Sequence, residues 1–175
     1  FGLAAFAADK YEVDNLHSSV LFKVRHAGLS NFYGRFNRLA GAFEFDEKDA
    51  NKCTVNVEVL TGSVDTNDAK RDKHLKGPDF FNAVQFPKMT FKSKSVKKLK
   101  DKHYEITGEL TFHGVTKEIK AKAEHIATKT NSRGQTKCGF EIHFEIKRSD
   151  FGVKYGIPGI GDDVAVTVSM EALKK

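Results

Sequence analysis

A chain of 175 residues has the length of one domain, and a domain of this size can bury an apolar core without a metal or a disulfide. Its content of 39% hydrophobic and 30% charged residues is typical of a globular protein, and no apolar run of roughly eighteen residues is present to span a bilayer. The net charge of +6 permits an anionic partner but does not by itself indicate one.

The N-terminal residues 1–8 are similar to the end of a secretory signal peptide. Ala5-Phe6-Ala7 forms a small-x-small pattern ahead of Ala8-Asp9. We therefore expect residues 1–8 to be a residual signal or flexible N-terminus, residues 9–175 to form one domain, and the protein to be exported. The alternative is a flexible or added tail, because the charged region that should precede a signal's apolar stretch is not present.

Alternating apolar and polar residues predict a series of β-strands. In chain order they cover residues 18–26, 32–46, 55–59, 88–95, 106–112, 119–123, 140–146 and 164–170. Segment 32–46 is expected to be one long or bent strand with kinks at Gly34 and Gly41. The clearest hairpin surrounds the tight turn His113-Gly114. Segment 92–102 is rich in lysine, but its alternation is typical of a solvated sheet face, and no nucleic-acid-binding motif accompanies it, so we expect no nucleic-acid partner.

One segment does not follow the strand pattern. Residues 67–76 predict a short helix, with Asn67 as its cap and Gly77-Pro78 as its end. Asp79-Phe80-Phe81 follows, and a helix with a Phe pair beside a barrel would act as a lid or plug. The later segment 148–163 is rich in glycine but lacks the phosphate-binding order GxxxxGK[ST], so we expect it to close the other end or edge of the barrel.

About eight strands with short connections must either close into a barrel or form a sandwich. Small residues on the expected inward phase favour a hollow barrel; they are Ser93, Ser95, Gly108, Ala121 and Ala123. A sandwich whose small residues face large Phe rings is the alternative. The fold class is therefore expected to be all-β with one or two short helices, and the barrel would enclose an apolar cavity.

The two cysteines, Cys53 and Cys138, lie in phase with the apolar residues of their strands and are expected to face one interior. The sequence leaves open whether they form a disulfide or remain two buried thiols, because geometry decides this.

The inward residues predict a cavity for a long apolar chain, which gains about 0.8 kcal/mol for each buried CH₂ group. The expected lining is Phe22, Val24, Phe36, Val57, Val59, Leu75, Phe80, Phe81, Phe91, Leu110, Phe112, Phe140, Ile142 and Phe144. Arg71, His74 and Asp79 are candidates for contact with a polar head group at the mouth. For Arg71 the alternative is an ion pair with Asp72 or Asp79, and for His74 it is a capping or packing role.

Three groups of residues together resemble the YceI-like family of bacterial periplasmic polyisoprenoid-binding proteins. The first is Asp14, His17-Ser18-Ser19-Val20, Phe22, Val24 and His26. The second is Ser63-Val64-Asp65-Thr66, Arg71-Asp72-Lys73-His74-Leu75 and Asp79-Phe80-Phe81. The third is Phe86-Pro87, Phe91, Ser93, Gly108, Leu110-Thr111 and Gly114-Val115-Thr116-Lys117. The resemblance extends from about Tyr11 to about Leu173.

The resemblance implies a lipocalin-like, extended eight-stranded antiparallel barrel in the periplasm that holds a polyisoprenoid or a fatty-acyl lipid, often as a homodimer. We expect no catalytic residue, cofactor or metal, because no GxSxG elbow and no HxH or HExxH spacing is present. Transient contact with a membrane surface remains open. The alternatives are a stress-response or protein-interaction domain with an incidental cavity, and a lipid-processing enzyme that uses His74 with Asp72 or His113 with Asp150.

Overall fold

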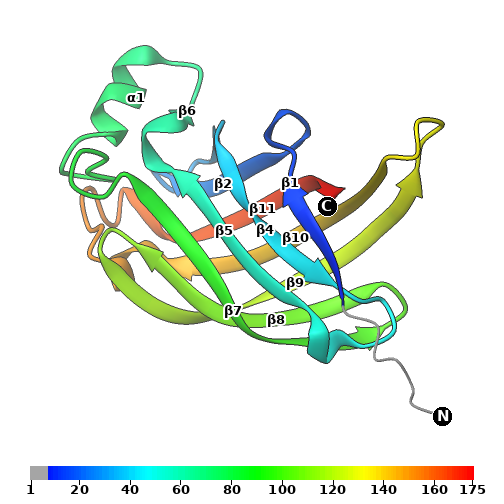
Figure 1. Cartoon of the computed structure of the whole chain (residues 1–175). Coiled ribbons are helices and arrows are strands. Elements are labelled where there is room, and N and C mark those ends of the chain that lie inside the picture. Colours follow the sequence, from blue (N-terminus) through cyan, green and yellow to red (C-terminus); the bar gives the residue numbers. More distant parts are fainter. Residues whose placement is uncertain (1–7) are drawn as a thin grey trace, which may run out of the picture.

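The computed structural model describes residues 8–175, which form eleven strands and one helix (Figure 1). The strands are β1 Asp9–Val13, β2 Ser19–His26, β3 Ser30–Phe36, β4 Leu39–Phe45, β5 Thr54–Leu60, β6 Val64–Asp65, β7 Lys88–Lys100, β8 His103–Phe112, β9 Val115–Thr130, β10 Thr136–Lys147 and β11 Ile160–Lys174. The helix is α1, Ala69–Leu75, and 3-10 turns cover Asn15–His17, Ala50–Lys52, Thr61–Ser63 and Arg148–Phe151. Most of the predicted signal segment, residues 1–7, lies outside the described residues.

The eleven strands build a closed antiparallel barrel with eight strand positions around its wall, because three of these positions are each shared by two consecutive strands. Strand β11 pairs with β2 along residues 160–169 and with β1 at residues 172–174, which closes the sheet. Because β1 and β2 pair with successive parts of β11, they occupy one position in the barrel wall. The strands β3 and β4 likewise share one position, since β2 pairs with β3 and β1 with β4. The strands β5 and β6 share the next, since β4 pairs with β5 and β3 with β6. The predicted eight-stranded antiparallel barrel is therefore confirmed, and the sandwich alternative is wrong.

The barrel opens at the end that carries α1. Pairing between β9 and β10 runs from Thr130 opposite Thr136 to Lys122 opposite His143, and no pairing of these two strands continues beyond it in residues 8–175. The two strands therefore separate toward this end, which we call the mouth.

Within residues 8–175, no helix has the length and apolar character needed to cross a bilayer.

The small residues expected to face the interior have four different roles. Ala121 and Ala123 do line the interior. Gly108 instead makes room for a ring, because a Cβ there would lie 2.5 Å from Cζ of Phe91. Ser93 accepts a hydrogen bond from the backbone N–H of Val55 at 2.8 Å. Ser95 is exposed, contrary to the expectation, because a β-bulge between Ser93 and Ser95 shifts the alternation and turns Val96 inward.

The predicted single strand over residues 32–46 is wrong, because the chain breaks between β3 and β4 at Asn37-Arg38. Gly41 does have an irregular backbone for a strand residue, with φ of 128°. Both glycines allow close approach. A Cβ at residue 34 would lie 2.2 Å from Cζ of Phe22, and one at residue 41 would lie 2.3 Å from the backbone oxygen of Asn56. Gly34 is thus the seat of the Phe22 ring on the neighbouring strand.

The predicted turns are partly correct. His113 and Gly114 have φ of 51° and 76°, as a two-residue type I′ hairpin requires, so this hairpin is confirmed. Helix α1 forms where expected, but its cap is Asp68, whose carboxylate accepts from the N–H of Arg71 at 2.7 Å, and not Asn67.

The glycine-rich segment after β10 lies at the mouth and not at the opposite end. The ring of Tyr155 packs 5.3 Å from that of His74 and 5.2 Å from that of Phe80, so this loop contacts the α1 segment. The reason is topological: β10 runs toward the same end as β5 and β8, and its outgoing connection must lie beside theirs.

The close contact between Gly34 and the Phe22 ring leads to a prediction about stability. Replacing Gly34 by Ala places a methyl carbon 2.2 Å from Cζ of Phe22, so the two side chains overlap. This overpacking is expected to destabilise the protein by about 1–3 kcal/mol. Urea unfolding would measure the change. Gly62→Ala is the matched control, because a Cβ there meets no atom within 4 Å, and its effect is expected within about 0.5 kcal/mol. Equal unfolding free energies for the two variants would contradict the role given to Gly34.

Candidate functional site

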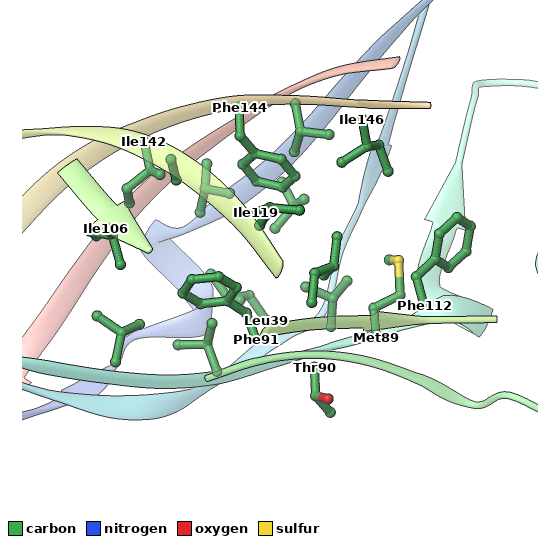
Figure 2. A pocket seen from close by; sticks show the side chains of 18 of the residues that line it. Leu39, Met89, Thr90, Phe91, Ile106, Phe112, Ile119, Ile142, Phe144 and Ile146 are labelled. Carbon is green, nitrogen blue, oxygen red and sulfur yellow. The ribbon is translucent and has the colours of Figure 1, made fainter. Parts of the chain in front are cut away.

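An apolar cavity of about 230 Å³ runs through the barrel interior. Its wall is built of inward side chains from strands on opposite sides of the barrel, and Figure 2 shows Phe91 and Met89 on one side with Ile142 and Phe144 on the other. The strand alternation explains this wall, since every second residue of a closed sheet must point inside.

The cavity is long. On β10 it is lined at every second position from Phe140 to Ile146, and Arg148 continues the row. Eight residue steps of strand correspond to about 26 Å, or about 20 Å along the axis of a barrel with the usual strand tilt. The cavity is therefore elongated along the barrel, and we call it the channel.

Thirteen of the fourteen predicted lining residues lie on the channel wall: Phe22, Val24, Phe36, Val57, Val59, Phe80, Phe81, Phe91, Leu110, Phe112, Phe140, Ile142 and Phe144. The exception is Leu75. It lies on α1 outside the barrel and packs, half-buried, against the apolar cluster beneath the helix.

Sequence reasoning missed other wall residues, which include Val20, Leu39, Phe43, Val96, Tyr104, Ile106, Ile146, Val166, Val168 and Met170. Most of them lie on predicted strands in the inward phase, so the alternation itself was the available signal. Val96 is different, because the bulge in β7 hides its orientation from a period-2 count.

Arg148 is a buried cation on the channel wall, with 5% of its surface exposed. Its guanidinium donates to the carbonyl oxygens of Gly161 at 2.8 Å, Ile160 at 2.8 Å and Val153 at 3.1 Å. Burial lowers its pKa, and the nearby Asp162 carboxylate opposes that effect. The arginine therefore fastens the end of β10 to the start of β11 and shapes the mouth.

A second, more polar hollow lies at the mouth, and we call it the vestibule. It is lined by Val24, His26, Ser30, Phe32, Arg71, His74, Phe80, Tyr155 and Ile160. Three of these residues, Val24, Phe80 and Ile160, also line the channel. The vestibule therefore adjoins the apolar channel at the mouth.

Arg71 is fixed in the vestibule by Thr66 and Phe32. Its Nε donates to Thr66 Oγ1 at 2.8 Å, one terminal nitrogen donates to the Thr66 carbonyl at 2.7 Å, and the guanidinium lies 4.7 Å from the centre of the Phe32 ring. The Thr66 hydroxyl donates in turn to Asp72. The expected alternative, an ion pair of Arg71 with Asp72 or Asp79, is therefore wrong. Asp72 acts on Arg71 only through Thr66.

His74 is held by Asp79 and by two aromatic rings. Its Nε2 lies 2.9 Å from Asp79 Oδ2, and its ring packs edge-on against Phe80 and Tyr155. Asp79 is not part of the vestibule wall, so its contact is with His74. Of the three head-group candidates, the structure brings Arg71 and His74 to the entrance together.

The opposite end of the channel holds the two cysteines, which are free and buried thiols. Burial raises the pKa of Cys138 to about 11 and also raises the pKa of Cys53. Because the thiolate is the reactive form, both are poor nucleophiles at neutral pH. His125 is buried nearby, burial lowers its pKa, and its ring packs against both Phe45 and Phe140.

The imagined catalytic pairs do not form. His74 meets Asp79 and not Asp72. Asp150 lies 3.9 Å from the ammonium of Lys117, and the buried Nε2 of His113 has no hydrogen-bond partner. One group that could ligate a metal occurs in residues 8–175: Asp14, His17 and Glu171. The ammonium of Lys137 already lies 3.1 Å from carboxylate oxygens of both Asp14 and Glu171. The ammonium of Lys137 therefore offsets one of the two carboxylate charges of this cluster.

Comparison with known proteins gives consistent matches over nearly the whole chain. A family model of the YceI-like domain matches residues 11–172. Protein YceI of Escherichia coli is 40% identical over 173 residues, which are 98% of this chain and 90% of that protein.

Two solved structures share the fold. Burkholderia cenocepacia BcnA has a TM-score of 0.83 and 22% identity, covering 91% of this chain and 98% of its own. A polyisoprenoid binding domain from Saccharophagus degradans has a TM-score of 0.72 and 17% identity, covering 94% and 98%.

The cluster of Asp14 yields a prediction about pH. The hydrogen bond with His17 is the main cause that lowers the pKa of Asp14 from 3.8, and Lys137 adds to it. A carboxyl group with a lowered folded-state pKa stabilises the protein above pH 3.8, and this contribution is lost as the pH falls through the folded-state pKa.

Asp14→Asn should therefore lower the unfolding free energy by about 1 kcal/mol at neutral pH. The difference from wild type should shrink below about pH 4. Urea unfolding at a series of pH values measures it. A difference that is constant with pH would contradict the role of the Asp14 charge.

Proposed function

The chain belongs to the YceI-like family, and from this membership and its channel we propose that it is a binding or carrier protein for a long-chain apolar lipid. The observation that carries the proposal is the continuous apolar channel between the mouth and the cysteine end. A filled barrel would need no row of alanines at Ala121 and Ala123 opposite its large residues.

The channel favours a linear ligand. Each CH₂ group of a buried chain gains about 0.8 kcal/mol, so a tail threaded through an apolar channel needs no specific polar contact for its affinity. An elongated channel suits a flexible chain better than a compact fused ring system. The proposed ligand is therefore a polyisoprenoid, such as a prenyl quinone or prenyl pyrophosphate, or a fatty acid or fatty amide. The polyisoprenoid binding domain with the same fold supports the first of these.

The proposal does not include catalysis. The buried thiols of Cys53 and Cys138 are protonated at neutral pH, so neither is poised as a nucleophile. As the family resemblance implies, we place the protein in the bacterial periplasm. There a carrier would shield an insoluble tail from water.

The entrance supplies the means to distinguish head groups. A guanidinium has five N–H donors, and Thr66 accepts from two of those on Arg71, so three remain for a ligand. Stacking on Phe32 holds this group in place at the vestibule. We propose that Arg71 binds an anionic oxygen of the head group, with His74 beside it.

The carrier proposal predicts that a lipid accompanies the purified protein. Organic extraction and mass spectrometry are expected to recover about one long-chain lipid per protein chain. Ala121→Leu narrows the channel and should lower this recovery. Lys122→Leu adds the same side chain to the outer face of β9 and serves as the control. A clean wild-type extract together with no uptake of prenyl or fatty-acyl probes would overturn the proposal.

The head-group proposal predicts a selective effect of Arg71→Ala. Affinity for geranylgeranyl diphosphate should fall about tenfold or more, because a charge-assisted hydrogen bond contributes about 1.5–3 kcal/mol. Affinity for geranylgeraniol, which has the same chain without the charge, should change little. Titration with both ligands measures the two effects. Arg133→Ala removes an equal charge from the far turn between β9 and β10 and is the control. Equal losses for both ligands would assign Arg71 to the scaffold alone.

A further inference from the structure

Four connections meet around the vestibule and form a continuous rim. They are the β2–β3 turn at residues 27–29, the segment 66–86, the β8–β9 turn at residues 113–114 and the segment 152–159. Each touches the next. The N–H of Ala27 donates to the carbonyl of Gly159 at 2.6 Å, and Gly152 borders His113, whose ring packs 4.7 Å from that of Phe86. The guanidinium of Arg71 lies over the ring of Phe32, and this contact links segment 66–86 to the β2–β3 hairpin.

The rim exposes large apolar side chains to solvent. Val84 is 95% exposed and Leu29 is 87% exposed, and they belong to two different connections of the rim. Tyr155 and Ile157, from a third connection, are 49% and 39% exposed. Single exposed apolar residues are common, but here they recur on three neighbouring connections around one opening. Exposing these four apolar side chains to water is unfavourable, so a partner that covers them would be stabilised.

The opposite end of the barrel is different. Its connections read Asp46-Glu47-Lys48-Asp49-Ala50-Asn51-Lys52, Asp101-Lys102 and Asn131-Ser132-Arg133-Gly134-Gln135. None of them carries a large apolar residue. Two half-exposed apolar residues, Leu99 and Ile126, lie at that end, but both belong to strands. The two ends, which face away from each other in Figure 1, therefore differ in the chemistry they present.

Lysines accompany the apolar rim residues. Lys70 and Lys73 on α1, with Lys76 behind it and Lys154 across the vestibule, have no carboxylate partner within residues 8–175. The neighbouring carboxylates are engaged, since Asp68 caps α1, Asp72 binds Thr66 and Asp79 binds His74. Exposed apolar side chains beside unpaired lysines suit an interface in which the apolar groups enter a bilayer and the ammonium groups meet anionic lipid head groups.

We propose that the rim docks on the surface of an anionic lipid bilayer, so that the vestibule faces the membrane. Val84 and Leu29 enter the head-group region, Tyr155 lies at the interface, and the lysines contact phosphate groups. The rim lies outside the channel, and its proposed docking role is separate from the binding of a lipid inside the barrel. Docking places the entrance where a membrane lipid can pass into the channel without crossing water.

Cosedimentation with vesicles tests the proposal. The wild-type protein should bind vesicles of phosphatidylcholine with phosphatidylglycerol more tightly than vesicles of phosphatidylcholine alone, and added salt should weaken the binding. Val84→Asp and Leu29→Asp should each lower partitioning by about tenfold or more, because each replaces an apolar side chain that would leave water with a charge that anionic head groups repel. Since both side chains are almost fully exposed, the fold should be unaffected.

Leu99→Asp is the matched control, because Leu99 is 50% exposed at the other end of the barrel. Its vesicle binding should equal that of the wild type. Equal binding by the rim variants and by Leu99→Asp would overturn the proposal, and so would wild-type binding that is absent or independent of phosphatidylglycerol.

A second readout separates docking from lipid carriage. Uptake of geranylgeraniol delivered from cyclodextrin should be the same for the wild type and Val84→Asp, whereas uptake from vesicles should be slower for the variant. Equal rates from vesicles would overturn the docking role. Failure of the wild type to take up the probe from cyclodextrin counts against the carrier proposal alone, since vesicle binding is measured without it.

Discussion

Closure of the sheet through β11 is the constraint on which the rest of the structure depends. One edge of β11 pairs with two separate strands, β2 near the mouth and β1 near the far end, while its other edge pairs with β10. A sheet that closes on itself must point every second side chain into a common interior. The apolar alternation of the sequence and the channel are therefore two consequences of one geometry.

The channel stays open because large rings are seated on glycines and not because the wall is made of small residues alone. Phe22 lies over Gly34, and Phe91 lies over Gly108, so the rings fold against the wall and leave the axis free. Ala121 and Ala123 supply further room on β9. The same number of Phe residues without these seats would fill the barrel.

The segment between β6 and β7 joins stability to recognition. Asp72, Thr66 and Arg71 form one hydrogen-bonded chain, which fixes the start of α1 and at the same time leaves a cation at the entrance. Phe80 and Phe81 from the same segment reach the channel wall. A residue of this segment can therefore be structurally necessary and still contact a ligand, so only a comparison of charged and uncharged ligands separates the two roles.

The sequence by itself determined most of the strands, the short helix, the His113-Gly114 hairpin and most of the channel wall, because alternation and turn chemistry are local properties of the chain. It did not indicate β1 or β6, or the break between β3 and β4. Only the tertiary structure decided the rest. The bulge in β7 reverses the phase of Ser95 and Val96, and topology places the 148–160 segment at the α1 end. The partner of Arg71 and the free state of the two cysteines depend on distances between segments far apart in the chain, and no local pattern carries that information.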